Sequence, residues 1–128
     1  KIQINKHNVI NRFVDYALVP QYLCAADIAV IWREKSVTNK VASPVKFSEY
    51  ICCGLPVIAN NSIKLIADFL QKNRCGMLIN SIDEIDPDSL LDLMEINRYE
   101  LSELGRRDFS IHSIAYRYIS IYQSIEKE

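Results

Sequence analysis

The stretch from Ser43 to Glu49 holds the residues whose types and spacing are best suited to chemistry. Ser43 and Pro44 have the residue types preferred at the N-cap and the first position of a helix, which predicts a helix beginning here. A helix N-terminus directs free backbone N–H groups and the positive end of the helix dipole outward, and a diphosphate suits such a site. Glu49 lies more than one turn further on, where its carboxylate could accept paired hydrogen bonds from the hydroxyls of a ribose. One helix could therefore hold both ends of a ribosyl diphosphate.

Three further residues belong to this predicted donor site. Val45 and Lys46 lie in the first turn of the helix, where a bound anion would offset the unfavourable interaction of a cation with the helix dipole. Arg33 ends an apolar run, and ligands of parallel sheets gather at the carboxyl edge. Ordinary roles remain open for these residues: Glu49 as a surface carboxylate, Lys46 and Arg33 as solvated side chains, and Ser43 as a plain cap.

Short apolar runs alternate with helical patterns along the whole chain. Strands are expected at residues 9–14, 28–31, 55–59 and 77–79. Helices are expected at residues 19–25, 43–54, 62–73, 86–96 and 111–125, and a polar loop at residues 34–42. Gly54 should close the second of these helices and Ser62 should cap the third. This alternation predicts an α/β fold, a Rossmann-like parallel sheet with flanking helices.

The C-terminal third of the chain is expected to be helical. Asn97 and Glu100 resemble a capping box that begins a short helix, with Gly105 as its end. The last predicted helix carries an apolar stripe, which is typical of a face that packs on the core. Its members are Ile111, Ile114, Ala115, Tyr118, Ile121, Tyr122 and Ile125. The length of 128 residues fits one domain over residues 1–128.

Composition excludes several classes of function. The chain is 49% hydrophobic and 24% charged, as in ordinary globular domains. With 15 Lys and Arg against 16 Asp and Glu, it offers no polycationic surface for nucleic acid. Its apolar runs are far shorter than the roughly 20 residues that span a bilayer. Cys24, Cys52, Cys53 and Cys75 form no CxxC pair, so we expect small buried thiols in a reducing cytoplasm, and neither a metal nor a cofactor.

Three motifs occur in a specific order. Residues 19–28 read VPQYLCAADI, residues 44–59 read PVKFSEYICCGLPVIA, and residues 75–78 read CGML. In this order they resemble "vp-x-yl-x-aADi", "P-x-K-x-x-EYmacGlPVIa" and "G-x-l" of the retaining GT-B glycosyltransferases of family 4, also called glycosyl transferases group 1. The resemblance extends over residues 9–78 and implies the C-terminal, nucleotide-sugar-binding domain of a two-domain enzyme.

The resemblance also implies an activity. Such a hexosyltransferase moves a glycosyl unit, with retention, from a nucleoside diphosphate sugar to a glycan or lipid-linked acceptor, without a metal. Glu49 matches the second glutamate of the family's pair, which binds the ribose, whereas the first would fall on Val41, so no catalytic residue is carried over. Polysaccharide synthesis in the cytoplasm, at the inner face of the cell membrane with peripheral membrane association, is the expected setting.

Parts of the enzyme are expected to lie outside this chain. The basic pair that binds the diphosphate in the family comes before the first motif, so we expect a domain incomplete at its N-terminus. The acceptor domain should be absent and the fragment alone inactive. The terminal helix would reach towards that other domain, which would leave Tyr116, Tyr118 or Tyr122 exposed in the fragment.

Two other functions remain open. A nucleotide-binding module without transferase activity would fit Val41 in place of the glutamate. A flavodoxin-like interaction domain would need an acidic cluster at a strand end, which the sequence does not offer.

Overall fold

The computed structural model describes residues 9–125, which fold around a small parallel sheet. Its strands are β1 (Ala29–Ile31), β2 (Val57–Ala59) and β3 (Gly76–Leu78). They lie side by side in the order β1-β2-β3, with Val30 opposite Ile58 and Ile58 opposite Met77. The predicted α/β class is confirmed, and three parallel strands are compatible with a Rossmann-like arrangement.

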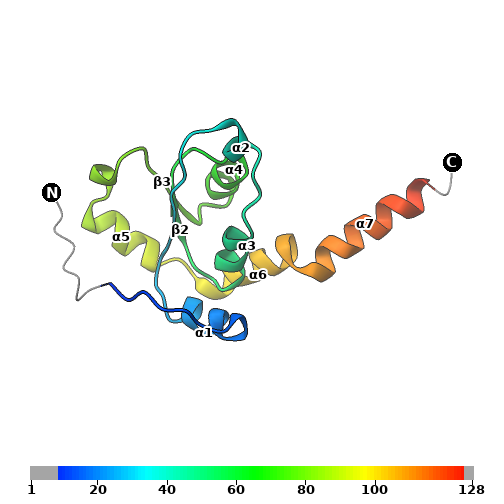
Figure 1. The fold of residues 1–128 in the computed structure, drawn as a ribbon, viewed down its shortest axis with the longest axis horizontal. Helices are drawn as coiled ribbons and strands as arrows, with labels where there is room; N and C mark the ends of the chain where they lie inside the picture. Colours follow the sequence, from blue (N-terminus) through cyan, green and yellow to red (C-terminus); the bar gives the residue numbers. More distant parts are fainter. Residues whose placement is uncertain (1–8, 126–128) are drawn as a thin grey trace.

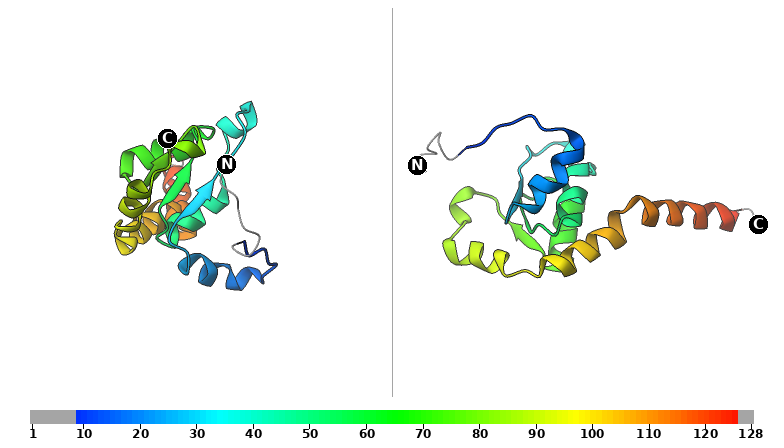
Figure 2. Two further views of the ribbon diagram at one scale, coloured as in Figure 1. Left: turned by 90° about the vertical axis from the view of Figure 1, so that its left-hand side faces the viewer. Right: turned by 90° about the horizontal axis from the view of Figure 1, so that it is seen from below.

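Helices cover both faces of this sheet (Figures 1 and 2). They are α1 (Val19–Cys24), α2 (Val37–Lys40), α3 (Val45–Cys52), α4 (Lys64–Asn73), α5 (Pro87–Met94), α6 (Arg98–Phe109) and α7 (Ile111–Ile125), with 3-10 turns at Tyr16–Leu18 and Ile82–Glu84. Side chains of α3, α4 and α6 pack on one face, and α5 packs on the other.

The middle strand explains why the apolar runs lack polar alternation. Successive side chains of a strand point to opposite faces of the sheet. Val57 and Ala59 pack with Phe47 of α3, while Ile58 packs on the opposite side with Leu93 of α5. All three residues of β2 are buried, so each must be apolar.

Three phenylalanines join the helices of the first layer. Phe47 lies edge-on to Phe69 of α4, with ring centroids 5.3 Å apart, and to Phe109 of α6 at 5.8 Å. The rings of Phe69 and Phe109 are 5.1 Å apart. Phe47 has no exposed surface, so the helix that holds the predicted site is anchored by its own core side chain.

Gly105 has a different role from the predicted one. It does not end a helix, because α6 continues to Phe109. Its lack of a side chain lets α6 lie directly against α3, since a Cβ here would be 2.7 Å from the backbone nitrogen of Cys52. The Ser102 hydroxyl donates to the Cys52 carbonyl at 2.7 Å across the same contact.

The terminal helix α7 extends away from the body of the molecule (Figures 1 and 2). None of its residues is buried, so the prediction that its stripe packs on the core of this chain is wrong. Tyr116, Tyr118 and Tyr122 are exposed, as the resemblance implied for a fragment. The stripe of α7 is therefore exposed within residues 9–125.

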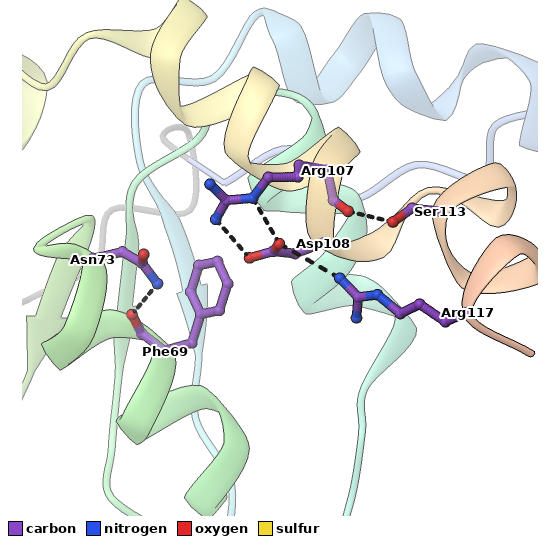
Figure 3. Close-up of polar contacts among 6 residues, drawn as sticks. All are labelled: Phe69, Asn73, Arg107, Asp108, Ser113 and Arg117. Carbon is purple, nitrogen blue, oxygen red and sulfur yellow. Dashed lines mark hydrogen bonds and ion pairs between the residues drawn. The ribbon is translucent and has the colours of Figure 1, made fainter. Parts of the chain in front are cut away.

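Polar contacts hold the start of α7 against α6 (Figure 3). The Asp108 carboxylate accepts from Arg107 Nε at 2.9 Å and lies 3.7 Å from Arg117 Nη2 of α7. The Ser113 hydroxyl donates to the Arg107 carbonyl, and the Ser113 amide donates to Ser110 Oγ at 3.1 Å.

Other predicted boundaries need correction. Residues 9–15 are irregular and exposed, so the candidate strand at 9–14 is wrong. The expected loop at 34–42 contains α2, whose N-cap Ser36 accepts from the Asn39 amide. Ser62 does not cap α4; its buried hydroxyl donates to the Arg33 carbonyl instead. The strand expected at 77–79 begins one residue earlier, and the helix expected to reach residue 96 ends at Met94.

Several local signals are confirmed. Asp86 caps α5 by accepting from the Ser89 amide at 2.9 Å. Asn97 caps α6 and donates to Glu100 Oε1 at 3.0 Å. Gly54 follows α3 with a positive φ of 72°, a conformation that favours glycine.

Candidate functional site

The N-terminus of α3 begins one residue later than predicted. Pro44 is the N-cap, with extended backbone and no side-chain hydrogen bond, and Val45 is the first helical residue. The Phe47 amide donates to the Pro44 carbonyl at 3.0 Å. Ser43 therefore lies outside the helix, and its predicted role as the N-cap is wrong.

One pocket gathers three of the predicted donor-site residues. It has a volume of about 280 Å³ and lies between β1 and α3, at the carboxyl end of β1. We call it the Lys46 pocket; its lining residues are Val30, Ile31, Trp32, Arg33, Pro44, Lys46 and Tyr50. Two cations and the end of an eight-residue helix meet here, an arrangement that attracts anions.

Glu49 lines a second pocket on the neighbouring face of α3. This Glu49 pocket has a volume of about 200 Å³ and is lined by Tyr16, Val19, Pro20, Leu23, Glu49, Cys52 and Cys53. The Tyr16 hydroxyl donates to Glu49 Oε1 at 3.2 Å. Lys46 and Glu49 are three residues apart on one helix, so their side chains are neighbours on its surface, and each lines a different pocket.

Ser43 and Val45 lie apart from both pockets. Both side chains are exposed, and among the described residues neither is part of the lining of the Lys46 or Glu49 pocket. Of the six predicted residues, the structure thus brings together Arg33, Pro44 and Lys46, and it places Glu49 beside them.

The loop after β2 fixes the end of β1. The Arg33 amide donates to Asn60 Oδ1 at 3.3 Å, and Asn60 Nδ2 donates to the Arg33 carbonyl at 2.7 Å. The Ser62 hydroxyl donates to the same carbonyl at 2.8 Å. These bonds hold the backbone that carries Arg33 at the mouth of the Lys46 pocket.

Sequence reasoning missed Tyr16, Trp32, Tyr50 and Asn60. A signal existed for Asn60, because polar residues that directly follow a buried strand lie at the carboxyl edge of the sheet. Trp32 follows β1 in the same way. Tyr50 faces the Lys46 pocket because it lies one turn after Lys46. Tyr16 precedes α1 by three residues, and nothing in its local pattern indicates contact with Glu49.

Burial and nearby charge weaken the acidity of groups around α3. Burial, followed by the charge of Glu49, raises the pKa of the Tyr50 phenol. Burial, and then the neighbouring Cys24 thiol, raises the pKa of Cys53 to about 11. All four cysteines are free, but the predicted burial holds fully only for Cys75: Cys52 and Cys53 are half-buried, and Cys24 is exposed. The raised pKa of Cys53 keeps its thiol protonated and unreactive near neutral pH.

A family model described as "Glucosyltransferase 3-like, C-terminal domain" matches residues 27–103, which is more than half of the chain. The chain belongs to this family. The match to the glucosyltransferase 3-like family supports the expectation of a glycosyltransferase C-terminal domain, and it includes every predicted donor-site residue. No curated protein and no solved structure matches the chain.

Tyr16 and helix α7 lie outside residues 27–103, the part of the chain that matches the glucosyltransferase 3-like family. Across residues 9–125, none of the helices has both the length and the apolar character needed to cross a membrane.

Proposed function

We propose that this chain is the nucleotide-sugar-binding domain of a retaining GT-B glycosyltransferase of the family 4 type, and that it holds a nucleoside diphosphate sugar at α3. The observation that carries the proposal is the meeting of Arg33 and Lys46 with the N-terminus of α3 in one pocket at the carboxyl edge of a parallel sheet. Parallel sheets of Rossmann-like domains bind nucleotides at this edge.

The diphosphate would occupy the Lys46 pocket. Lys46 and Arg33 would approach its oxygens, and the amides of the first turn of α3 would add their dipoles. During glycosyl transfer, negative charge develops on the leaving diphosphate, and prepositioned cations and dipoles lower the energy of that transition state. Stabilisation of the leaving group is thus the contribution we assign to this domain.

The nucleoside would extend towards Glu49. A carboxylate has about four lone-pair sites, so Glu49 can accept from both ribose hydroxyls while it holds the Tyr16 hydroxyl. The apolar wall formed by Val19, Pro20 and Leu23 would lie beside the nucleoside. The order diphosphate then ribose along α3 follows the order Lys46 then Glu49.

The wider setting follows from the same resemblance. We assign acceptor binding to a separate domain, treat residues 1–128 as one donor-binding domain that is inactive alone, and place the enzyme in polysaccharide synthesis at the cytoplasmic face of the membrane. Val41 favours a second candidate, a module that binds the nucleotide without transfer. Its side chain is 83% exposed and offers no carboxylate where the resemblance would place one.

The fluorescence of Trp32 tests donor binding directly, because the chain has one tryptophan and it lines the Lys46 pocket. We expect saturable changes when UDP, GDP and their glucose conjugates are titrated, with the true nucleotide binding tightest. Lys46→Ala should weaken binding about tenfold, as expected for loss of a charge-assisted contact. Lys72→Ala, a change at an exposed lysine of α4, serves as the control. Absence of any change up to about 5 mM would overturn the proposal.

A further inference from the structure

Another hollow of the described chain lies apart from the Lys46 pocket. Two adjoining cavities of about 460 and 590 Å³ open between α2, α4 and the loop after β2. Lys40, Asn61 and Ser62 line both, so we treat them as one feature, the Lys40 pocket. Its other lining residues are Lys35, Ser36, Val37, Val41, Lys64, Ala67, Asp68 and Gln71. Such volumes are typical of small-molecule sites, which measure roughly 300–1,000 Å³.

The Lys40 pocket is electropositive although the chain is not. The chain as a whole has a net charge of −1. Three lysines line the pocket against one acidic residue, Asp68. Lys64 Nζ is bound to both oxygens of Asp68, at 2.9 and 3.1 Å, so these two charges offset each other. Lys35 and Lys40 have no ion-pair partner within residues 9–125, and their charges remain available to a ligand.

Hydrogen bonds order the walls of this pocket. Asn39 Nδ2 donates to the Glu34 carbonyl at 2.8 Å, and the Asn39 amide donates to Ser36 Oγ at 3.1 Å, so the short helix that carries Lys40 is tied at its start. On the opposite wall, Ser62 is 2% exposed and its hydroxyl donates to the Arg33 carbonyl. Lys40 therefore faces a fixed wall across the pocket.

Arg33 separates this pocket from the donor site. It lines the Lys46 pocket, while its carbonyl is bound by Ser62, which lines the Lys40 pocket. Within the described residues, none lines both pockets. Two basic sites thus lie next to each other at the carboxyl edge of the sheet. Together they hold more cationic side chains than the binding of one diphosphate requires.

We propose that the Lys40 pocket is a second anion site, and that it binds a phosphate group of the acceptor beside the donor, while the separate domain holds the rest of the acceptor. The identity of this ligand as an acceptor rests on the proposed function; the anion site itself does not. The alternative source of the same chemistry is the diphosphate of the donor. An acceptor phosphate held by Lys35 and Lys40 would bring the two substrates together on either side of Arg33.

Backbone-amide NMR of the chain tests this proposal with inorganic phosphate as the probe, first alone and then with saturating UDP. We expect phosphate to shift the amides of Lys40, Asn61 and Ser62 in a saturable way, and to do so equally well with UDP present. Lys40→Ala should weaken phosphate binding by at least about threefold, as for loss of one exposed charge contact.

Two further variants sharpen the result. Val41→Glu adds a carboxylate at a position that is 83% exposed, so the fold should survive and phosphate binding should weaken about as much as in Lys40→Ala. Lys72→Ala removes a lysine of α4 that does not line the pocket and should leave phosphate binding unchanged.

The possible failures point to different conclusions. Without shifts at Asn61 and Ser62, or with equal shifts in Lys40→Ala, the anion site is wrong. Loss of the phosphate shifts on addition of UDP would overturn the assignment to an acceptor and show that the Lys40 pocket binds the diphosphate of the donor. Phosphate binding without any response to UDP at α3 would instead contradict the proposed function and leave the anion site standing.

Discussion

The Tyr16 hydroxyl donates a hydrogen bond to Glu49 Oε1 over 3.2 Å, and so joins the segment before α1 to the middle of α3. The two residues are 33 positions apart in the sequence. This bond orients the carboxylate in the Glu49 pocket before any ligand binds. Glu49 therefore presents its remaining lone pairs in a fixed direction, which would lower the entropy cost of the proposed ribose contact.

The first prediction concerns this pair. Glu49→Ala removes the proposed acceptor of both ribose hydroxyls and should weaken UDP binding at least tenfold, because hydrogen bonds to charged groups contribute about 1.5–3 kcal/mol. Tyr16→Phe removes only the orienting bond and should weaken binding about threefold to fivefold. Calorimetric titration gives both values. Equal affinities of Glu49→Ala and the unaltered chain would contradict the role of Glu49.

The second prediction concerns the contact between α3 and α6. Gly105→Ala should destabilise the fold by about 1–3 kcal/mol, because the new methyl group must displace the backbone of Ile51 and Cys52. Alanine's higher helix propensity, about 1 kcal/mol over glycine, offsets part of this cost. Urea unfolding measures the change, and Tyr99→Ala at an exposed position of the same helix is the control. A stabilised Gly105→Ala variant would show that α6 can move away freely.

The third prediction concerns thiol reactivity. Burial raises the pKa of Cys53 and of Cys75 to about 11, so near pH 8 only about one thiol in a thousand is ionised at each site. The alkylation rate of Cys53 should rise about tenfold per pH unit from pH 7 to 10. Cys75 is 3% exposed, so it should react only when the chain unfolds. Peptide mapping by mass spectrometry follows each site, with exposed Cys24 as the internal reference. A Cys53 rate that levels off below pH 8 would disprove the raised pKa.

The fourth prediction concerns the junction of α6 and α7. The Arg107 guanidinium, hydrogen-bonded to Asp108, lowers the pKa of that carboxyl below its ordinary value of 3.8. A carboxyl with a lowered folded-state pKa stabilises the fold above its unfolded pKa and loses this contribution as the pH falls through the folded value. The unaltered chain should therefore exceed Asp108→Asn in stability at pH 7, by less than about 1 kcal/mol because Arg107 is exposed.

Urea unfolding between pH 7 and pH 3 measures this difference, which should shrink only as the pH falls below about 4. Asp92→Asn, at an exposed position of α5, is the matched control. A difference that grows towards low pH would contradict the assignment.

Local chemistry made part of the fold predictable. Contiguous apolar residues identified β1 and β2, but the expected burial of both faces holds only for β2, because Val30 of β1 is 60% exposed. Asp86 and Asn97 identified two helix starts because capping is a local interaction between a side chain and amides two or three residues on. Gly54 identified a helix end because its conformation has a positive φ.

Other features depend on distant contacts and could not be predicted in this way. Gly105 has a residue type common at helix ends, but glycine is needed here because a side chain would collide with the backbone of α3, more than 50 positions earlier. The apolar stripe of α7 has the pattern of a core helix, and the pattern does not say which surface covers it. Within the site, the pairing of Tyr16 with Glu49 and of Asn60 with Arg33 arises only when the chain folds.

The most direct test of the account is backbone-amide NMR of this chain during titration with UDP, GDP and their sugar conjugates, alongside Glu49→Ala. The account predicts shifts concentrated at residues 44–49 and at Arg33, weakened by Glu49→Ala, with one nucleotide clearly preferred. Shifts confined to other parts of the chain, or no shifts at millimolar ligand, would contradict a donor site at the N-terminus of α3.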